Sequence, residues 1–183
     1  MDLIDRTDNR FTRHRAVGTL GSILVLRGDH DEGIATLREQ VLAQPTDAMA
    51  QLFARAEVAR GLLGKGELEL AHAEAQKTID DAGFLFQPHK STALAILAEI
   101  AIARGDRDAA LKLAREGRAI GEQSGMDALT ASTVRAIEAE LSGDAEIVAT
   151  AVARIEAIAR ELAPLGLEPA WRAIPVHART LAL

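Results

Sequence analysis

The chain has 183 residues with 21 basic and 27 acidic side chains, which give a formal net charge of −6. Its length suits one domain of ordinary size, and a hydrophobic content of 48% makes it too apolar for intrinsic disorder. Aromatic residues make up 3% with no Tyr, which argues against an all-β sandwich and favours close-packed helices. Because Cys is absent, disulfides, thiol nucleophiles and cysteine-based zinc sites are excluded.

The N-terminal segment and the hydropathy pattern bear on cellular location. Residues 1–6 carry acidic side chains where a signal peptide needs a basic segment. No stretch approaches the roughly 18 consecutive apolar residues of a membrane span, and the acidic balance argues against a general DNA or RNA binder. We therefore expect a cytoplasmic protein with no membrane or nucleic-acid partner. A local basic cluster is interpreted as a solvated helix face; it comprises Arg6, Arg10, Arg13, His14 and Arg15.

A pair of a glycine and an acidic residue recurs four times, with spacings of 38, 39 and 38 residues. Gly supplies the left-handed backbone that ends a helix, and the acidic residue after it suits the N-terminus of the next helix. Each pair therefore predicts a tight turn between two antiparallel helices. The four pairs are Gly28-Asp29, Gly66-Glu67, Gly105-Asp106 and Gly143-Asp144.

Apolar residues recur at helical spacing on both sides of each turn, as Leu94, Leu97 and Ala98 do before Gly105. In chain order we predict the helix pairs 9–27 with 31–44, 47–64 with 67–82, 89–104 with 107–123, and 127–142 with 145–163. Loops that contain Pro45, Gly83 and Gly125 separate the pairs. A short terminal helix is expected within 169–183, interrupted or started by Pro175.

These pairs define four units and a cap within one repeat domain that spans residues 1–183. A single helix hairpin cannot bury its apolar face alone, so neighbouring hairpins must stack side by side. Stacking of this kind predicts an all-α solenoid rather than a single four-helix bundle. The predicted units are 9–44, 47–82, 89–123 and 127–163, with the cap at 169–183.

The first and third units resemble the tetratricopeptide repeat (TPR) family. The first unit has Leu20-Gly21, the run 27–35 around Gly28-Asp29 and a closing Pro45, and the third has the run 103–111. The resemblance implies a right-handed α-solenoid of about four TPR-like hairpins with a short C-terminal capping helix. The chain departs from the family pattern because the second and fourth units lack the Pro and aliphatic residues replace most aromatic ones.

The whole chain also resembles the C-terminal TPR regions of bacterial multidomain regulators of the kinase and ATPase type. The ending 174–183 is similar to the tail of such regions. The chain is then either a stand-alone relative or a piece of a larger regulator, and both interpretations stay open. Fold alone does not fix function.

The sequence shows no catalytic constellation, so we expect no enzyme, no cofactor and no metal. No two of the five His residues lie four apart on one helix. The metal-like run 29–32 falls in a repeat turn, where Asp29 and Glu32 have capping roles. The glycines around Lys65 do not have the spacing of a phosphate-binding loop. Glu138 and Glu140 are two residues apart, so both are interpreted as members of a solvated helix face.

The family resemblance implies a concave wall lined by the first helix of each pair. Phe53 between Arg15 and Arg60 would suit an extended peptide with an apolar and an acidic side chain. The alternative is that Phe53 belongs to the core and both Arg side chains are merely solvated. The candidate groove residues are Arg15, Ser22, Phe53, Arg60, Thr92, Glu99, Thr133 and Ile137.

Three aromatic residues are candidates for an interface. Trp171, which follows Pro169, either caps the open end of the solenoid or anchors a partner. Phe84 and Phe86 lie in the loop between the second and third units and mark either an association site or a staple between units. A homodimer formed through this loop or through the ends of the solenoid stays open.

The most direct interpretation is a non-enzymatic helical repeat module that binds a protein or peptide as a scaffold, adaptor or regulatory sensor. The alternative is an accessory protein that binds a small peptide or metabolite in a biosynthetic or signalling operon. The sequence does not identify the partner.

Overall fold

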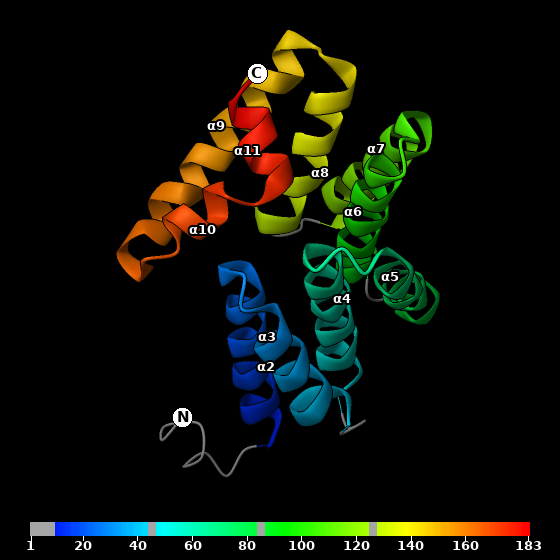
Figure 1. Ribbon diagram of the computed structural model, residues 1–183, viewed down its shortest axis with the longest axis vertical. Coiled ribbons are helices and arrows are strands. Elements are labelled where there is room, and N and C mark those ends of the chain that lie inside the picture. The colour runs from blue at the N-terminus through cyan, green and yellow to red at the C-terminus, as the bar shows by residue number, and fades with distance from the viewer. Residues whose placement is uncertain (1–9, 44–46, 84–86, 125–127) are drawn as a thin grey trace. The chain divides into compact units, whose positions relative to one another are not determined.

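The computed structural model describes residues 10–43, 47–83, 87–124 and 128–183, and every regular element in these ranges is helical (Figure 1). This finding confirms the predicted all-α class. Contacts divide the chain into two compact units, residues 1–81 and 82–183. Within the described ranges, no helix is both long enough and apolar enough to cross a bilayer.

The first unit consists of two helix pairs. In chain order they are α2 (Arg10–Arg27), α3 (His30–Leu37) with its π-helical extension η1 (Arg38–Leu42), α4 (Ala48–Gly64) and α5 (Leu68–Ala82). Helix α2 packs against both α3 and α4, and α3 packs against α4.

Glycines allow a close approach of the helices in this unit. A Cβ atom at Gly21 would lie 2.5 Å from Cγ of Leu37, whose side chain is fully buried. On α4, a Cβ at Gly61 would lie 2.9 Å from a side-chain carbon of Ile34. Because neither position has room for a methyl group, the core of this unit depends on glycine at both.

The second unit contains two further helix pairs and a short C-terminal segment. Its elements are α6 (Gln87–Ala103), α7 (Arg107–Ser124), α8 (Ala128–Ser142), α9 (Ala145–Leu162), the 3₁₀ turn η2 (Ala163–Leu165), α10 (Glu168–Arg172) and α11 (Pro175–Leu181). Consecutive helices from α6 to α9 pack against each other, and α6 also contacts α8. Helix α11 packs against α8 and α9 (Figure 1).

The four predicted glycine turns are confirmed. Gly28, Gly66, Gly105 and Gly143 have φ angles of 89°, 76°, 81° and 65°. This left-handed conformation is strained for residues with a Cβ atom, which explains why glycine stands at each turn.

The acidic residues after these glycines cap the next helix at only two of the four turns. Asp144 accepts hydrogen bonds from the main-chain N–H groups of Glu146 and Ile147 at 2.9 and 3.1 Å, and Asp106 accepts one from Ala109 at 3.0 Å. The Asp29 side chain makes no capping hydrogen bond; instead its Oδ2 lies 3.6 Å from Nε of Arg27. The predicted capping role of Asp29 is therefore wrong.

The predicted helix boundaries agree with the structure to within a few residues, with two differences. The second predicted helix ends as the π-helical turn η1. Helix α6 begins at Gln87 rather than 89, because Pro88 fits the first turn, where a main-chain N–H has no partner to lose. The terminal helix is interrupted before Pro175, as expected, and Pro175 begins α11 after the short α10.

Trp171 is buried within the C-terminal segment. Only 3% of the residue is exposed, and its indole Nε1 donates a hydrogen bond to the carbonyl of Ile155 on α9 at 3.1 Å. The ring centroid of His177 lies 4.1 Å from that of Trp171. This placement favours the capping interpretation, so Trp171 is not an exposed interface anchor.

Candidate functional site

Helices α2 and α4 bring four of the predicted groove residues together. Arg15 Nη2 donates to Met49 Sδ at 3.1 Å, and the Phe53 ring lies 3.6 Å from where a Cβ of Gly18 would stand. One helical turn further along, the Ser22 hydroxyl donates to a carboxylate on α4 at 3.0 Å. We call this set the α2–α4 row; it comprises Arg15, Ser22, Phe53, Glu57 and Arg60.

Glu57 supplies the carboxylate of the row and was not among the residues predicted from the sequence. The residue is 7% exposed, and its Oε2 receives the Ser22 hydroxyl and lies 3.4 Å from Arg60 Nε. The i, i+3 spacing of Glu57 and Arg60 was a signal for this pair. The row therefore contains two guanidinium groups and one carboxylate, and its local charge is positive.

Phe53 has features of a core residue and of a groove residue that could contact a peptide. Its ring packs on α2 at Gly18, as a core residue would, yet the residue is only half-buried. Arg15 is exposed beside Met49, which is itself 40% exposed. Part of an apolar surface therefore remains accessible next to a guanidinium group.

The four groove residues predicted in the second unit do not form a comparable surface. Thr133 and Ile137 on α8 are 2% and 0% exposed, and Thr92 on α6 is 7% exposed; Glu99 is half-buried. The reason is that α8 is surrounded by α6, α7, α9 and α11. Thr133 and Ile137 therefore do not line an open groove, contrary to the prediction.

The predicted solvated pair Glu138 and Glu140 is also not what the structure shows. Glu138 is 3% exposed, and its two carboxylate oxygens lie 2.7 Å from Arg118 Nε and 3.4 Å from Arg115 Nε. The side chain of Glu140 is 14% exposed and pairs with Arg179 on α11 at 2.8 Å. Both carboxylates therefore hold helices together.

A second carboxylate extends this ion network across α7 and α8. Glu122 Oε1 accepts hydrogen bonds from Arg118 Nη1 at 3.1 Å and from Arg135 Nη2 at 3.0 Å. The hydrogen bond with Glu122 and the charge of Glu138 raise the pKa of Arg118, so its guanidinium stays charged.

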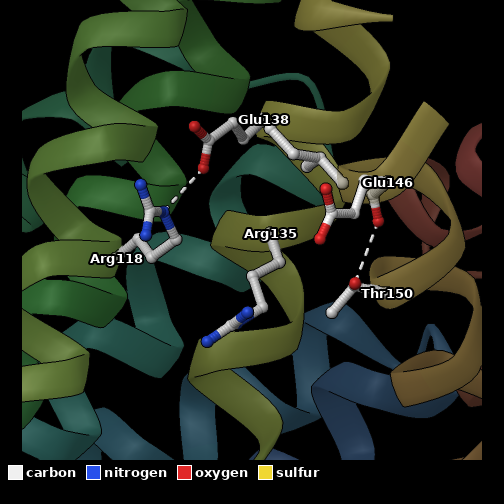
Figure 2. Close-up of a pocket in the computed structure, with 6 residues that line it drawn as sticks. Arg118, Arg135, Glu138, Glu146 and Thr150 are labelled. Carbon is white, nitrogen blue, oxygen red and sulfur yellow. Dashed lines mark hydrogen bonds and ion pairs between the residues drawn. The ribbon is translucent and has the colours of Figure 1, made fainter. Parts of the chain in front are cut away.

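A cavity of about 190 Å³ lies beside this network, between α7, α8 and α9. Figure 2 shows Arg118, Arg135 and Glu138 at one side and the first turns of α9 at the other. There the Thr150 hydroxyl donates to the main-chain oxygen of Glu146 at 2.9 Å. The lining residues are Arg118, Arg135, Glu138, Glu146, Ile147 and Thr150.

The metal-like run 29–32 contributes to a structural contact. Lys65 Nζ lies 2.7 Å from both Asp31 Oδ1 and Glu67 Oε1, so it joins the start of α3 to the turn between α4 and α5. The hydrogen bond with Lys65 lowers the pKa of Asp31. No group of three or more His, Asp or Glu residues in the described parts of the chain is placed to hold a metal ion.

Phe84 and Phe86 lie outside the described residues, as do Arg6 and the loop residue Pro45. The side chains of Arg10, Arg13 and His14 are likewise outside what the structure describes.

No family model matches the chain, and no curated protein matches it. A crystal structure from Podosopora anserina, described as a kinesin light chain with nearly identical TPR-like repeats, is similar to it with a TM-score of 0.54. The match covers 96% of this chain and 86% of that one at 18% sequence identity. An identity this low shows the fold alone. The chain therefore has the fold of TPR-like helical repeats, an all-α fold of the α-solenoid class.

Proposed function

We propose that the chain is a non-enzymatic helical repeat module that binds an extended segment of a partner protein on the α2–α4 row. The observation that carries this proposal is that the Phe53 ring packs on α2 at Gly18, near the contact of Arg15 with Met49, while Arg60 lies two helical turns further along α4. The row offers an aromatic ring and positive charge, and the exposed Met49 lies beside Arg15, within reach of the same short peptide.

The chemistry of the row favours an acidic segment with a large apolar side chain. The two positive charges of Arg15 and Arg60 outnumber the single negative charge of Glu57. The row is therefore locally positive, although the net charge of the whole chain is −6. An acidic side chain gains a charge-assisted hydrogen bond from either guanidinium group. An apolar side chain gains contact area on Phe53 and on Met49, a residue type that adapts to varied partners.

The role of such binding as scaffold, adaptor or sensor depends on the partner. The resemblance of residues 174–183 to the tail of bacterial regulators supports a regulatory role. A cytoplasmic partner protein would be consistent with that role.

A peptide-display selection on the purified full chain tests the proposal. We expect selected peptides to combine an acidic residue with a nearby Leu, Phe or Met. Arg60→Glu should lower the affinity for the selected peptides by about tenfold, since it reverses one charge of the row. Fluorescence anisotropy measures these affinities. Arg154→Glu is the matched control, because Arg154 is exposed on α9 in the other unit.

The proposal is wrong if the selected peptides bind the Arg60→Glu and wild-type chains equally. It is also wrong if the peptides carry no acidic residue. Circular dichroism of each variant separates a loss of binding from a loss of folding.

A further inference from the structure

The cavity between α7, α8 and α9 has hydrogen-bond donors left over on one wall. The carboxylate of Glu138 is taken up by Arg115 and Arg118, and Glu122 takes one N–H from each of Arg118 and Arg135. A guanidinium group has five N–H donors. Among the described contacts, Arg118 Nη2 and the Nε and Nη1 of Arg135 remain available to a ligand.

The opposite wall has acceptors left over. Glu146 lies in the first turn of α9, and its carboxylate makes no ion pair with any residue that the structure describes. Thr150 uses its hydroxyl hydrogen on the main-chain oxygen of Glu146, which leaves lone pairs on its Oγ1. Ile147 adds an apolar contact between these two residues.

The charges around the cavity balance. Two guanidinium groups, those of Arg118 and Arg135, and two carboxylates, those of Glu138 and Glu146, line it. A ligand carboxylate would be attracted by the arginines but repelled by Glu146. A ligand ammonium would be attracted by Glu146 but repelled by the arginines. Each charged group therefore meets a repulsive element, which is a common basis of specificity.

A carboxamide fits this arrangement, because its oxygen accepts and its NH₂ group donates without a net charge. The cavity volume of about 190 Å³ suits one amino-acid side chain and is too small for an extended cofactor. We propose that this cavity is a pocket for the side-chain amide of Gln or Asn in a partner segment. The amide oxygen faces Arg118 and Arg135, and the amide NH₂ faces Glu146 and Thr150. This pocket lies in the second unit and is independent of the α2–α4 row.

The test uses three small probes whose side chains end in an amide, a carboxylate and an ammonium group. They are the N-acetyl, N-methylamide derivatives of Gln, Glu and Lys, titrated into the ¹⁵N-labelled full chain. We expect saturable chemical-shift changes at the Nε–H groups of Arg118 and Arg135 and at the main-chain amides of 146–150. The Gln probe should bind about tenfold more tightly than the Glu and Lys probes.

A charge reversal provides the sharper test. Glu146→Lys makes the pocket positive, so the Glu probe should become the tightest of the three. Glu161→Lys is the matched control, since Glu161 is an exposed residue of the same helix outside the cavity, and it should keep the preference for Gln. Thr150→Val removes one hydrogen-bond acceptor at nearly constant side-chain shape. It should lower the affinity for the Gln probe without changing the relative affinities of the Glu and Lys probes.

Equal affinities for the three probes, or the absence of saturable shifts around the cavity, would overturn the proposal. An unchanged order of affinities in Glu146→Lys would do the same. The α2–α4 row takes no part in these readouts, so their failure leaves the proposed function untouched, and the reverse also holds.

Discussion

The Nε atom of Arg118 lies 2.7 Å from Oε2 of Glu138, whose residue is only 3% exposed. A buried carboxylate without its cation is costly, because water cannot replace the lost interaction. This pair fixes α7 against α8 and forms one wall of the cavity between α7, α8 and α9.

Arg118→Ala should lower the free energy of unfolding by about 1.5–3 kcal/mol, the range for a hydrogen bond to a charged group. Arg115 remains near Glu138 and limits the loss. Urea denaturation of the single variants and of Arg118→Ala with Glu138→Gln gives the coupling energy of the pair. A coupling energy of zero would contradict this account of the interface.

Two glycines of α2 provide a matched pair of substitutions. A Cβ at Gly21 would lie 2.5 Å from Leu37, whereas a Cβ at Gly18 would lie at an ordinary 3.6 Å from Phe53. Gly21→Ala should therefore destabilise the fold by about 1–3 kcal/mol through overpacking. Gly18→Ala should be neutral or stabilise it by up to about 1 kcal/mol, since Ala favours the helix. Chemical denaturation measures both; equal effects would show that α2 and α3 are not closely packed.

Trp171→Ala should lower the free energy of unfolding by about 3–5 kcal/mol, the usual range for removing a buried Trp. Trp171→Phe retains most of the packing but loses the hydrogen bond to Ile155, so it should cost less. Thermal unfolding followed by circular dichroism ranks the three proteins. In the wild type, the fluorescence of this single Trp should shift to longer wavelength on unfolding. An emission maximum typical of exposed Trp in the folded protein would contradict the capping role.

The contact between Lys65 and Asp31 predicts a dependence of stability on pH. The pKa of Asp31 is lowered in the folded protein from its ordinary value of 3.8, mainly by the hydrogen bond with Lys65. The contact therefore stabilises the fold above that ordinary pKa, and its contribution is lost as the pH falls through the lower pKa of the folded state.

Lys65→Gln should reduce the acid-induced loss of stability below about pH 4, because the pKa of Asp31 then returns toward its ordinary value. Lys112→Gln is the matched control, since Lys112 is exposed on α7 and makes no ion pair with a described residue. Thermal unfolding from neutral to acid pH gives the comparison. The same acid dependence in wild type and Lys65→Gln would rule out this contact in solution.

The turns and helix pairs could be predicted from the sequence because their causes are local. Gly28 and Gly105 combine a left-handed backbone with apolar runs on both sides, and those signals lie within a few residues. The capping bond of Asp47 to the N–H groups of Met49 and Ala50 was predictable for the same reason.

The site was less predictable, because its causes lie far apart in the chain. Glu138 is buried by Arg115 and Arg118, which are 23 and 20 residues away, so its neighbours in sequence gave no sign of burial. Ile137 was placed on an open wall because the packing of α11 on α8 has no signature in α8 itself. The proximity of the helices that carry Arg15 and Phe53 was predictable, because family-like helix pairs place their first helices side by side.

The space shared by Gly21 and Leu37 has a consequence for how this protein can diverge. Only one of the two positions can carry a bulky side chain, because the Leu37 side chain already fills the space that a side chain at position 21 would need. In related chains a larger residue at 21 should therefore accompany a smaller one at 37. Such covariation would record the spacing of the two helices in an alignment, even where identity has fallen too low for either residue to be recognised alone.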